Sequence, residues 1–567
     1  MPTIHHTEIY TQYQTKMRVR WLSVSATMAI LLSIASLPLL TQNTINNYTT
    51  FTSSFSNFLK IFRSKTVQRG VADLIVTNGT IFTSDDSLPF AQSMAIRSGR
   101  IIQVGDYSSV QFMSTQDLAG PGTRELNLEG KMVVPGFIDS HVHLISGGLQ
   151  MARVELHDVK SKDHFVDKVK EAVANMKQGS WLLGGGWNND FWGGELPMAS
   201  WIDDITPHNP VWLSRIDGHM GLANSLALKL AGTSSYMNDP DGGAIIRNSN
   251  GEATGLLVDS TMKLITSCIP EVSVDVRREA LMRASNLALM RGVTTVVDVG
   301  RYFPGSSTET SWEDFSDVYT WADLVGKMLI RVCLFFPIET WARLRDLKYK
   351  AGPKLSEKIY LGGVKAFADG SLGSSSALFH EPYVDEPHNS GLEVADINSL
   401  HGMTVSADKA GLQVAIHAIG DKANALILDM YASVVSHNGF RDRRFRIEHA
   451  QHLVPGMASR FSEQAIIASV QVADINPLGS MRTAMKRIPS GWHEAWSSSE
   501  CMNLSDALKA YTIWAAHGCF LDKDVGSISP GKLADFVVLS TDSWDEFSRE
   551  GSAYVEATYM GGIRAFP

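Results

Sequence analysis

The sequence predicts an α/β protein that combines a parallel (β/α)8 barrel with a small β-sandwich built by both ends of the chain. Three observations lead to this prediction. Apolar, β-branched runs alternate with helix-like stretches over residues 133–520, which is the pattern of repeated βα units. Several of these runs end in His, Lys or Asp, and a barrel gathers its strand ends at one face. Residues 72–132 and 521–567 instead contain short strands separated by turn residues.

The first 71 residues are predicted to form three segments ahead of the folded part. Residues 1–20 read as a cytosolic tail, because basic residues precede the mostly apolar residues 21–40. Residues 21–40 are long enough to cross a bilayer, as a signal-anchor or a cleaved signal peptide, and their all-round apolar character disfavours an organellar presequence. Residues 41–71 read as a polar linker. We therefore expect anchoring in an endomembrane such as the perinuclear endoplasmic reticulum, or a luminal or secreted protein if the segment is cleaved.

Composition and net charge limit the kinds of molecule that the chain is expected to bind. The chain of 567 residues has 44% hydrophobic and 19% charged residues, as a folded globular protein does. Its net charge of −9 and the lack of a long basic run argue against a nucleic-acid partner. We expect a small-molecule partner, and a homodimer is an assembly to test.

The terminal strands come first in the chain. Residues 73–82 give a strand, an Asn-Gly turn and the start of a second strand, and residues 94–105 repeat the pattern. Residues 531–539 are a further strand signal near the other end, so one small domain should draw on both ends. The middle of the chain then predicts buried strands at 181–187, 211–214, 294–298, 330–335, 360–367, 413–417, 445–449 and 466–471, and helices at 274–291 and 422–436.

Five side chains suggest a metal site. His141 and His143 are two residues apart at the end of an apolar run, so in a strand they point the same way and can share one ion. Lys365, His417 and His449 each end a separate apolar run. A single His at a strand end is more often a structural, hydrogen-bonded residue than a ligand. Four histidines and a lysine in such positions make coincidence improbable.

Five motifs carry a family resemblance. Residues 135–143 (PGFIDSHVH) resemble the opening metal motif of the amidohydrolase superfamily. The motifs of amidohydrolase family 3 are matched at 364–373 (VKAFADGSLG), 416–421 (IHAIGD), 446–451 (RIEHAQ) and 526–535 (GSISPGKLAD). That family includes N-substituted formamide deformylases, and also plant proteins associated with far-red light signalling. The resemblance implies a TIM-type barrel of the metal-dependent hydrolase type, which hydrolyses carbon–nitrogen bonds other than peptide bonds.

The resemblance also implies a binuclear zinc site. His141 and His143 would hold one ion, His417 and His449 the other, and Lys365 would bridge both as a carbamate formed with carbon dioxide. Zinc lowers the pKa of a bound water to roughly 7, so a zinc-activated water would be the nucleophile that attacks an amide or N-acyl amine.

Other residues take supporting roles in the same comparison. Asp217, His219 and Asn224 resemble the family's substrate-binding loop, although ordinary loop polarity explains them equally well. Asp369 and Asp421 are expected to orient the neighbouring Lys365 and His417 rather than to contact substrate.

One part of the family pattern is missing. Members carry an Asp at the end of the eighth strand that ligates metal and shuttles a proton. Here the segment holding helix 7 and strand 8 is absent between Gln471 and Val472, through a true isoform or a gene-model error. Asp474 lies beyond the lost position and is a poor substitute. We therefore expect a gap in the barrel wall and impaired activity. The alternative is a non-catalytic amidohydrolase-like protein that acts in plant light signalling.

Overall fold

The computed structural model describes residues 71–106, 118, 120–215, 220–233, 243–302, 307–372, 376–384, 386–470, 475–488, 492–548 and 553–567. The predicted tail, apolar segment and nearly all of the predicted linker lie outside these residues. Within them, no helix is both long and apolar enough to cross a bilayer. The longest described helix, α13 (Asp421–Asn438), carries charged residues along its length and buries one face against the barrel. The expectation of a membrane-anchored protein is corrected accordingly.

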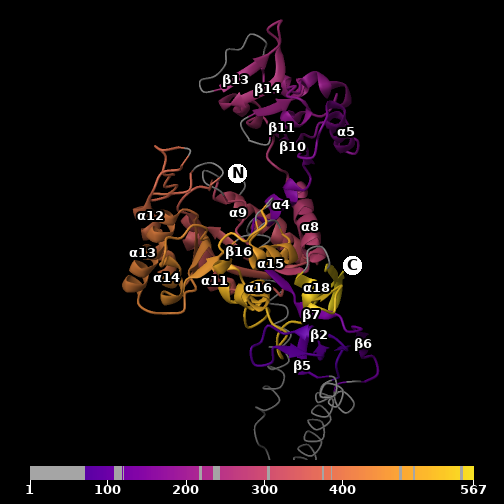
Figure 1. The fold of residues 1–567 in the computed structure, drawn as a ribbon, viewed down its shortest axis with the longest axis vertical. Helices are drawn as coiled ribbons and strands as arrows, with labels where there is room; N and C mark the ends of the chain where they lie inside the picture. The colour runs from indigo at the N-terminus through magenta and orange to yellow at the C-terminus, as the bar shows by residue number, and fades with distance from the viewer. Residues whose placement is uncertain are drawn as a thin grey trace, which may run out of the picture. The chain divides into compact units, whose positions relative to one another are not determined.

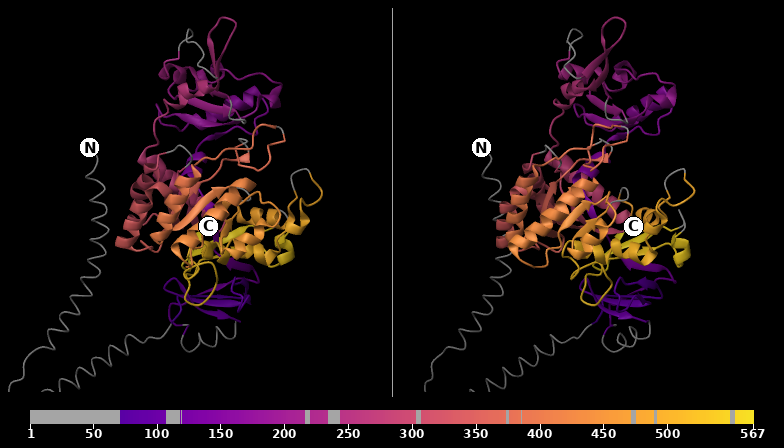
Figure 2. Two further views of the ribbon diagram at one scale, coloured as in Figure 1. Left: turned by 90° about the vertical axis from the view of Figure 1, so that its left-hand side faces the viewer. Right: turned by 60° about the vertical axis from the view of Figure 1, so that its left-hand side comes forward.

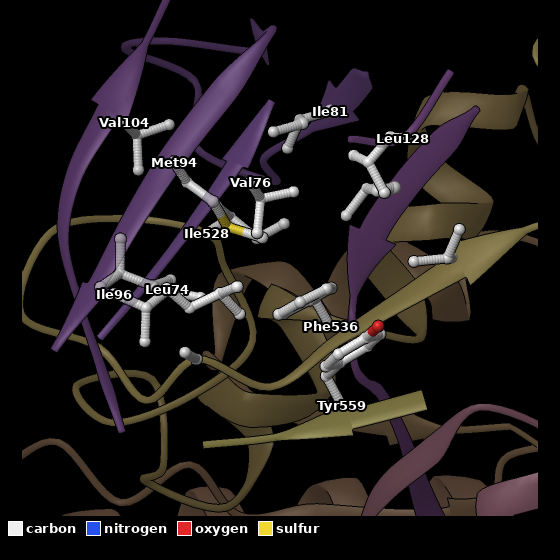
Figure 3. Close-up of a cluster of buried hydrophobic side chains, with 14 of the residues drawn as sticks. Leu74, Val76, Ile81, Met94, Ile96, Val104, Leu128, Ile528, Phe536 and Tyr559 are labelled. Carbon is white, nitrogen blue, oxygen red and sulfur yellow. The ribbon is translucent and has the colours of Figure 1, made fainter. Parts of the chain in front are cut away.

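Both ends of the chain build a β-sandwich, as the sequence predicted. Its hydrophobic core draws Leu74, Val76 and Met94 from the N-terminal strands and Phe536 and Tyr559 from the C-terminal strands (Figure 3). Its first sheet has the order β5 (Arg100–Gly105), β4 (Ser93–Arg97), β1 (Leu74–Thr77), β6 (Arg124–Asn127). Its second has the order β23 (Ile563–Phe566), β22 (Val555–Met560), β21 (Phe536–Leu539), β7 (Met132–Pro135), β2 (Thr80–Phe82), β3 (Phe90–Ala91), and α18 (Trp544–Ser548) follows β21.

The sandwich leads directly into the barrel at Gly136, which joins β7 to β8 (Phe137–Val142). A side chain at Gly136 would collide with Thr294 on the neighbouring strand, so the close approach of these strands requires glycine there. The sandwich thus fixes the start of the strand that carries His141.

Seven parallel strands form a nearly closed barrel, which confirms the predicted α/β barrel fold. Buried, β-branched residues make these strands nearly continuous apolar runs, because both faces of a parallel sheet are covered. The strand order is β20 (Ile467–Ser469), β19 (Arg446–His449), β18 (Gln413–Ala418), β17 (Ile359–Phe367), β16 (Arg331–Pro337), β15 (Val293–Asp298), β8. Helices α11 (Trp341–Ala351), α12 (Ile397–Lys409), α13 and α14 (Met457–Glu463) cover the outside of this sheet (Figures 1 and 2). The remaining barrel helices are α9 (Glu309–Asp314), α10 (Thr320–Leu324), α15 (Pro477–Lys486), α16 (Leu504–Ala510) and α17 (Ile513–Gly518).

No eighth strand lies between β20 and β8 among the described residues. Arg446 bridges this seam, because its Nη2 donates to the Ser140 carbonyl at 2.6 Å and to the Ser469 hydroxyl at 3.0 Å. The hydroxyls of Ser140 and Ser469 approach to 3.5 Å. The Ile138 N–H donates to the Tyr511 carbonyl at 2.8 Å, at the end of α16. The deletion predicts unpaired backbone groups along the edges of this gap. Some of the polar groups there are instead hydrogen-bonded, by the Arg446 guanidinium and by the end of α16.

Residues 144–284 form a separate compact unit. The sequence had assigned them to the barrel, but the predicted strands at 181–187 and 211–214 belong to a different, mixed sheet. Its order is β13 (Gly243–Arg247), β14 (Ala253–Asp259), β12 (Met220–Ala223), β11 (Val211–Arg215), β10 (Leu182–Trp187), β9 (Val154–Glu155). Helices α4 (Leu144–Gln150), α5 (Lys162–Val173), α6 (Ser225–Leu230) and α7 (Lys263–Thr266) accompany it, and α8 (Val274–Met290) leads back to the barrel. Because β9, β10 and β11 are parallel and carry apolar residues, their sequence pattern resembles that of barrel strands.

Candidate metal centre

Four imidazoles gather at the carboxyl ends of the barrel strands. His141 is on β8 and His143 directly follows it, while His417 is on β18 and His449 ends β19. The ring centroids are 5.6 Å apart for His141 and His143, 4.9 Å for His141 and His449, and 4.5 Å for His417 and His449. Residues more than 300 positions apart in sequence thus surround one space.

The backbone at His449 is unusual. His449 has φ 73° and the following Ala450 has φ 43°, both in the left-handed region that residues with a side chain rarely adopt. Such conformations cost free energy and persist where surrounding contacts impose them. The strained turn sets the direction in which the His449 ring leaves the strand.

Lys365 lies at the same end of β17 and is completely buried. Its Nζ has no hydrogen-bond partner among the described residues, and it sits 3.9 Å from the centroid of the Phe367 ring. Burial lowers the pKa of Lys365 to about 8. An amine without a partner in a buried site is costly, so this position calls for a group that the protein chain does not itself supply.

A carboxylate that the sequence analysis did not single out holds His141. Glu448 Oε2 lies 2.5 Å from His141 Nδ1, and Glu448 is in turn paired with Arg446, whose Nε lies 2.7 Å from Oε1. Burial would raise the pKa of Glu448, but Arg446 and His141 outweigh it and hold that pKa well below the usual range. Burial lowers the pKa of His141 to about 3. A neutral His141 that donates from Nδ1 has its lone pair on Nε2, which is the form that binds a metal.

Backbone carbonyls orient two more of the histidines. His143 Nδ1 lies 2.5 Å from the Gly300 carbonyl, and His417 Nε2 lies 2.9 Å from the Gly370 carbonyl. Burial lowers the pKa of His143 to about 4 and that of His417 to about 2, so both rings are neutral at pH 7. Donation to a carbonyl fixes the tautomer of each ring and places the lone pair on its other nitrogen.

Asp369 lies beside His417. Its carboxylate accepts hydrogen bonds from the backbone N–H groups of Leu378, Ile419 and Gly420 at 2.8–3.0 Å, and one oxygen is 3.4 Å from His417 Nε2. Burial raises the pKa of Asp369. Asp369 therefore fixes the turn that follows His417.

Asp421 begins α13 and accepts a hydrogen bond from the His380 N–H at 2.9 Å. This contact ties the loop before α12 to the end of the His417 strand. Both carboxylates thus brace the segments around His417.

Of the three predicted substrate residues, Asn224 alone is among the described residues. Asp217 and His219 lie outside the described residues, as do Gln471, Val472 and Asp474. Asn224 is buried in the unit of residues 144–284, where its Oδ1 accepts from the Val211 and Ala227 N–H groups at 3.0 and 2.9 Å. Its Nδ2 donates to Thr206 and Asn209, so Asn224 caps α6 and ties it to the preceding loop.

No group of three His, Cys, Asp or Glu side chains among the described residues is placed to hold an ion as it stands. The donor set nevertheless fits a metal centre, because it combines neutral imidazoles of fixed tautomer with a buried amine that lacks a partner. Nitrogen ligands of this kind suit zinc and other divalent transition metals.

A parallel α/β barrel with clustered imidazoles at its strand ends defines the class of metal-dependent hydrolases. The comparison with protein families places the chain within that class. Residues 124–490 and 470–564 match the amidohydrolase family, so the chain belongs to it.

Known proteins extend this result. The chain is 58% identical over 589 residues to Protein LONG AFTER FAR-RED 3 of Arabidopsis thaliana, covering 96% of this chain and 98% of that protein. It is 26% identical to the N-substituted formamide deformylase of Arthrobacter pascens, covering 87% and 98% of the two chains. It also resembles the crystal structure of an uncharacterized metal-dependent hydrolase from Pyrococcus horikoshii OT3, with 26% identity, a TM-score of 0.67 and coverage of 82% and 97%.

The family match is divided near the predicted deletion. The family match falls into two segments that overlap at residues 470–490, a range that includes Gln471 and Val472. The alignment with the Arabidopsis protein runs over 589 residues, more than the 567 of this chain, so some residues of the relative have no counterpart here. The division of the family match falls where the described barrel strands leave a gap between β20 and β8.

Proposed function

We propose that this chain is a zinc-dependent hydrolase of carbon–nitrogen bonds other than peptide bonds, with small N-acyl amines as substrates. Turnover would be reduced by the loss of the eighth strand. Membership of the amidohydrolase family and the similarity to a formamide deformylase support the reaction class.

The observation that carries the proposal is the buried amine of Lys365. An amine with a pKa of about 8 is partly unprotonated at pH 7, and the unprotonated nitrogen adds to the carbon of CO2 to form a carbamate with release of one proton. The carbamate shares one negative charge between two oxygens, so it could bridge two cations held by His141, His143, His417 and His449. It would also end the isolation of Nζ, which lacks a partner among the described residues.

Bound zinc would supply Lewis-acid polarisation of the substrate carbonyl and a lowered pKa for the attacking water. The chain's own residues prepare this chemistry. Glu448 holds the His141 ring through Nδ1, and burial keeps His141, His143 and His417 neutral, so these rings do not have to lose protons before they bind a cation. In this proposal Asp217 and His219 contact substrate, while Asn224 holds α6 to the loop at Thr206 and Asn209.

The missing eighth strand is expected to lower the rate of hydrolysis. Proton transfer by a positioned side chain is worth about 10²- to 10⁴-fold, and none of the described side chains replaces the lost carboxylate. Restoring the missing segment from the Arabidopsis relative should therefore raise hydrolysis by orders of magnitude on a panel of N-formyl and N-acetyl amines.

Metal content tests the site without reference to activity. Lys365→Ala should lose one or both zinc ions in elemental analysis of purified protein, and added short carboxylic acids should restore part of the binding. Lys358→Ala is the matched control, because Lys358 is also largely buried but its Nζ donates to the Leu329 carbonyl at 3.0 Å. An unchanged zinc stoichiometry in Lys365→Ala would remove the bridging role.

A second function is favoured by the missing strand together with the 58% identity to Protein LONG AFTER FAR-RED 3. It is a non-catalytic role in light signalling. The two proposals separate on the restored chain, since a signalling protein of this kind stays inactive across the panel even with all eight strands and bound zinc.

A further inference from the structure

A cavity of about 340 Å³ lies where the barrel wall lacks its eighth strand. The edges of β8 and β20 form one side of it, and α15, α16 and α17 form the other. Its size falls within the range of about 300–1,000 Å³ that is typical of small-molecule sites. The backbone segment that carries His141 forms part of the wall.

The gap between β8 and β20 does not leave room for an added peptide strand to pair with their edges. Arg446 Nη2 is bonded to Ser140 on β8 and to Ser469 on β20, and the two serine hydroxyls approach to 3.5 Å. An added strand would have to displace this bridge and leave the buried Arg446 without those acceptors. A compact molecule in the cavity behind the seam does not disturb the bridge.

The side chains that line the cavity favour a ligand with a mainly apolar surface. Ile138 and Ile467 line the strand side, and Met481, Met502 and Ala507 line the helix side. Methionines adapt their shape to a guest more readily than branched side chains do, because they are unbranched and flexible.

Two side chains offer hydrogen bonds to a guest. The Ser480 side chain on α15 is 1% exposed, and its hydroxyl has no partner among the described residues. Asp139 lines the same cavity, and its Oδ1 accepts from the His141 N–H at 3.2 Å. A buried hydroxyl without a partner costs free energy that a guest with a polar group can relieve.

The charges around the cavity favour a neutral guest. The Asp139 carboxylate disfavours an anion, and the mostly apolar walls make any charged guest lose hydration without regaining it, because the Arg446–Glu448 pair is already satisfied. We propose that this seam cavity binds a compact, uncharged molecule with an apolar body and one hydroxyl or amide group directed at Ser480 and Asp139. His141 also lines the cavity, so the site adjoins the metal-ligand candidates, but binding there does not depend on hydrolytic activity.

Benzyl alcohol is a suitable probe, with benzoate and benzylamine as charged compounds that share its aromatic body. The full chain should bind benzyl alcohol with a Kd of about 1 mM or tighter, on the scale expected for a ligand of so few atoms. Saturation-transfer NMR and titration calorimetry measure this binding, and both charged compounds should bind at least tenfold more weakly.

Two variants locate the site. Ser480→Ala should weaken benzyl alcohol about fivefold, the worth of one hydrogen bond of about 1 kcal/mol. Ala484→Leu, which enlarges a partly exposed lining residue of α15, should abolish binding. Ser436→Ala on α13, whose hydroxyl donates to the Ala432 carbonyl, is the control and should bind normally.

Three results would overturn the proposal. They are no saturable binding up to 20-fold above the expected Kd of about 1 mM, equal binding of all three probes, or wild-type affinity in Ser480→Ala. If circular dichroism shows that Ala484→Leu does not fold, Ser480→Ala still decides the outcome.

Discussion

Arg446 provides the sharpest test of how this barrel holds together. Its side chain is 1% exposed and makes four contacts: two to the buried Glu448, at 2.7 and 3.1 Å, one to the Ser140 carbonyl and one to the Ser469 hydroxyl. Arg446→Met keeps much of the apolar volume but removes the charge and every donor. Glu448 is then left as a buried carboxylate whose remaining partner is the neutral His141.

The expected cost is large. Removing one partner of a buried ion pair costs about 3–5 kcal/mol, because the other charge stays buried. Each of the two seam hydrogen bonds adds about 0.5–1.5 kcal/mol, although contributions that share one side chain do not add fully. We expect a loss of about 4 to 6 kcal/mol, a large part of the roughly 5–15 kcal/mol that stabilises a folded domain.

Urea unfolding and hydrogen exchange measure this loss. Arg446→Met should lower the urea midpoint, and peptides that contain β8 and β20 should exchange faster than those from the sandwich. The double variant Arg446→Met with Glu448→Gln should recover part of the stability, since the unpaired charge is gone. Arg345→Met is the control, because Arg345 is exposed and its contacts are with the neighbouring Asp346 and the ring of Trp341 on the same helix, so it should change stability by less than about 0.5 kcal/mol. A cost below about 1 kcal/mol in Arg446→Met would refute the seam bridge.

Three further perturbations have defined outcomes. Asn224→Ala removes a buried cap with partners on both of its polar atoms, so it should destabilise the unit of residues 144–284 by about 2–4 kcal/mol, seen as faster hydrogen exchange there but not in the barrel. Asp369→Asn replaces a carboxylate that accepts three backbone N–H groups with a side chain that has one acceptor oxygen, and should cost about 1–3 kcal/mol in urea unfolding. Chelator-treated protein should lose stability as the pH falls from about 6.5 towards 4, because His141, His143 and His417 have depressed pKa values of about 3, 4 and 2 and the unfolded state binds more protons in that window. His417→Gln should reduce the slope of unfolding free energy against pH by about 1.4 kcal/mol per unit, and an unchanged slope would show that His417 is not buried as a neutral ring.

Much of the barrel could be predicted from the sequence, because its strands are buried on both faces. The predicted strands at 294–298, 330–335, 360–367 and 413–417 fall within one or two residues of β15, β16, β17 and β18. Short apolar runs of this kind reveal that a strand exists, but not which sheet it joins. The strands at 181–187 and 211–214 have the same pattern, and their placement in a separate sheet depends on long-range packing that the pattern does not encode.

The metal-ligand candidates were predictable for a similar reason, since each stands at the end of an apolar run. The groups that form hydrogen bonds with these histidines could not be predicted in the same way. Glu448 contacts a histidine 307 positions away, and the Gly300 carbonyl faces His143 only after the loop beyond β15 has folded back. A charged pair two residues apart in a buried strand, such as Arg446 and Glu448, was the signal available in the sequence, because such residues point to the same side and must find partners there.

The arrangement explains how a chain can lose a strand and keep the rest of a metal site. Each strand of a barrel contributes its own residues to the site. Losing one strand therefore removes the side chains of that strand and leaves those on β8, β17, β18 and β19 in place. The loss of a strand leaves the barrel wall open, and here Arg446 links the two strands on either side of the opening. The same bridge holds Glu448, which orients His141, so closure of the wall and the orientation of a metal-ligand candidate rest on one guanidinium. A restored strand would therefore have to do more than add a carboxylate, because it must also take over the acceptors at Ser140 and Ser469 without releasing the pairing of Arg446 with Glu448.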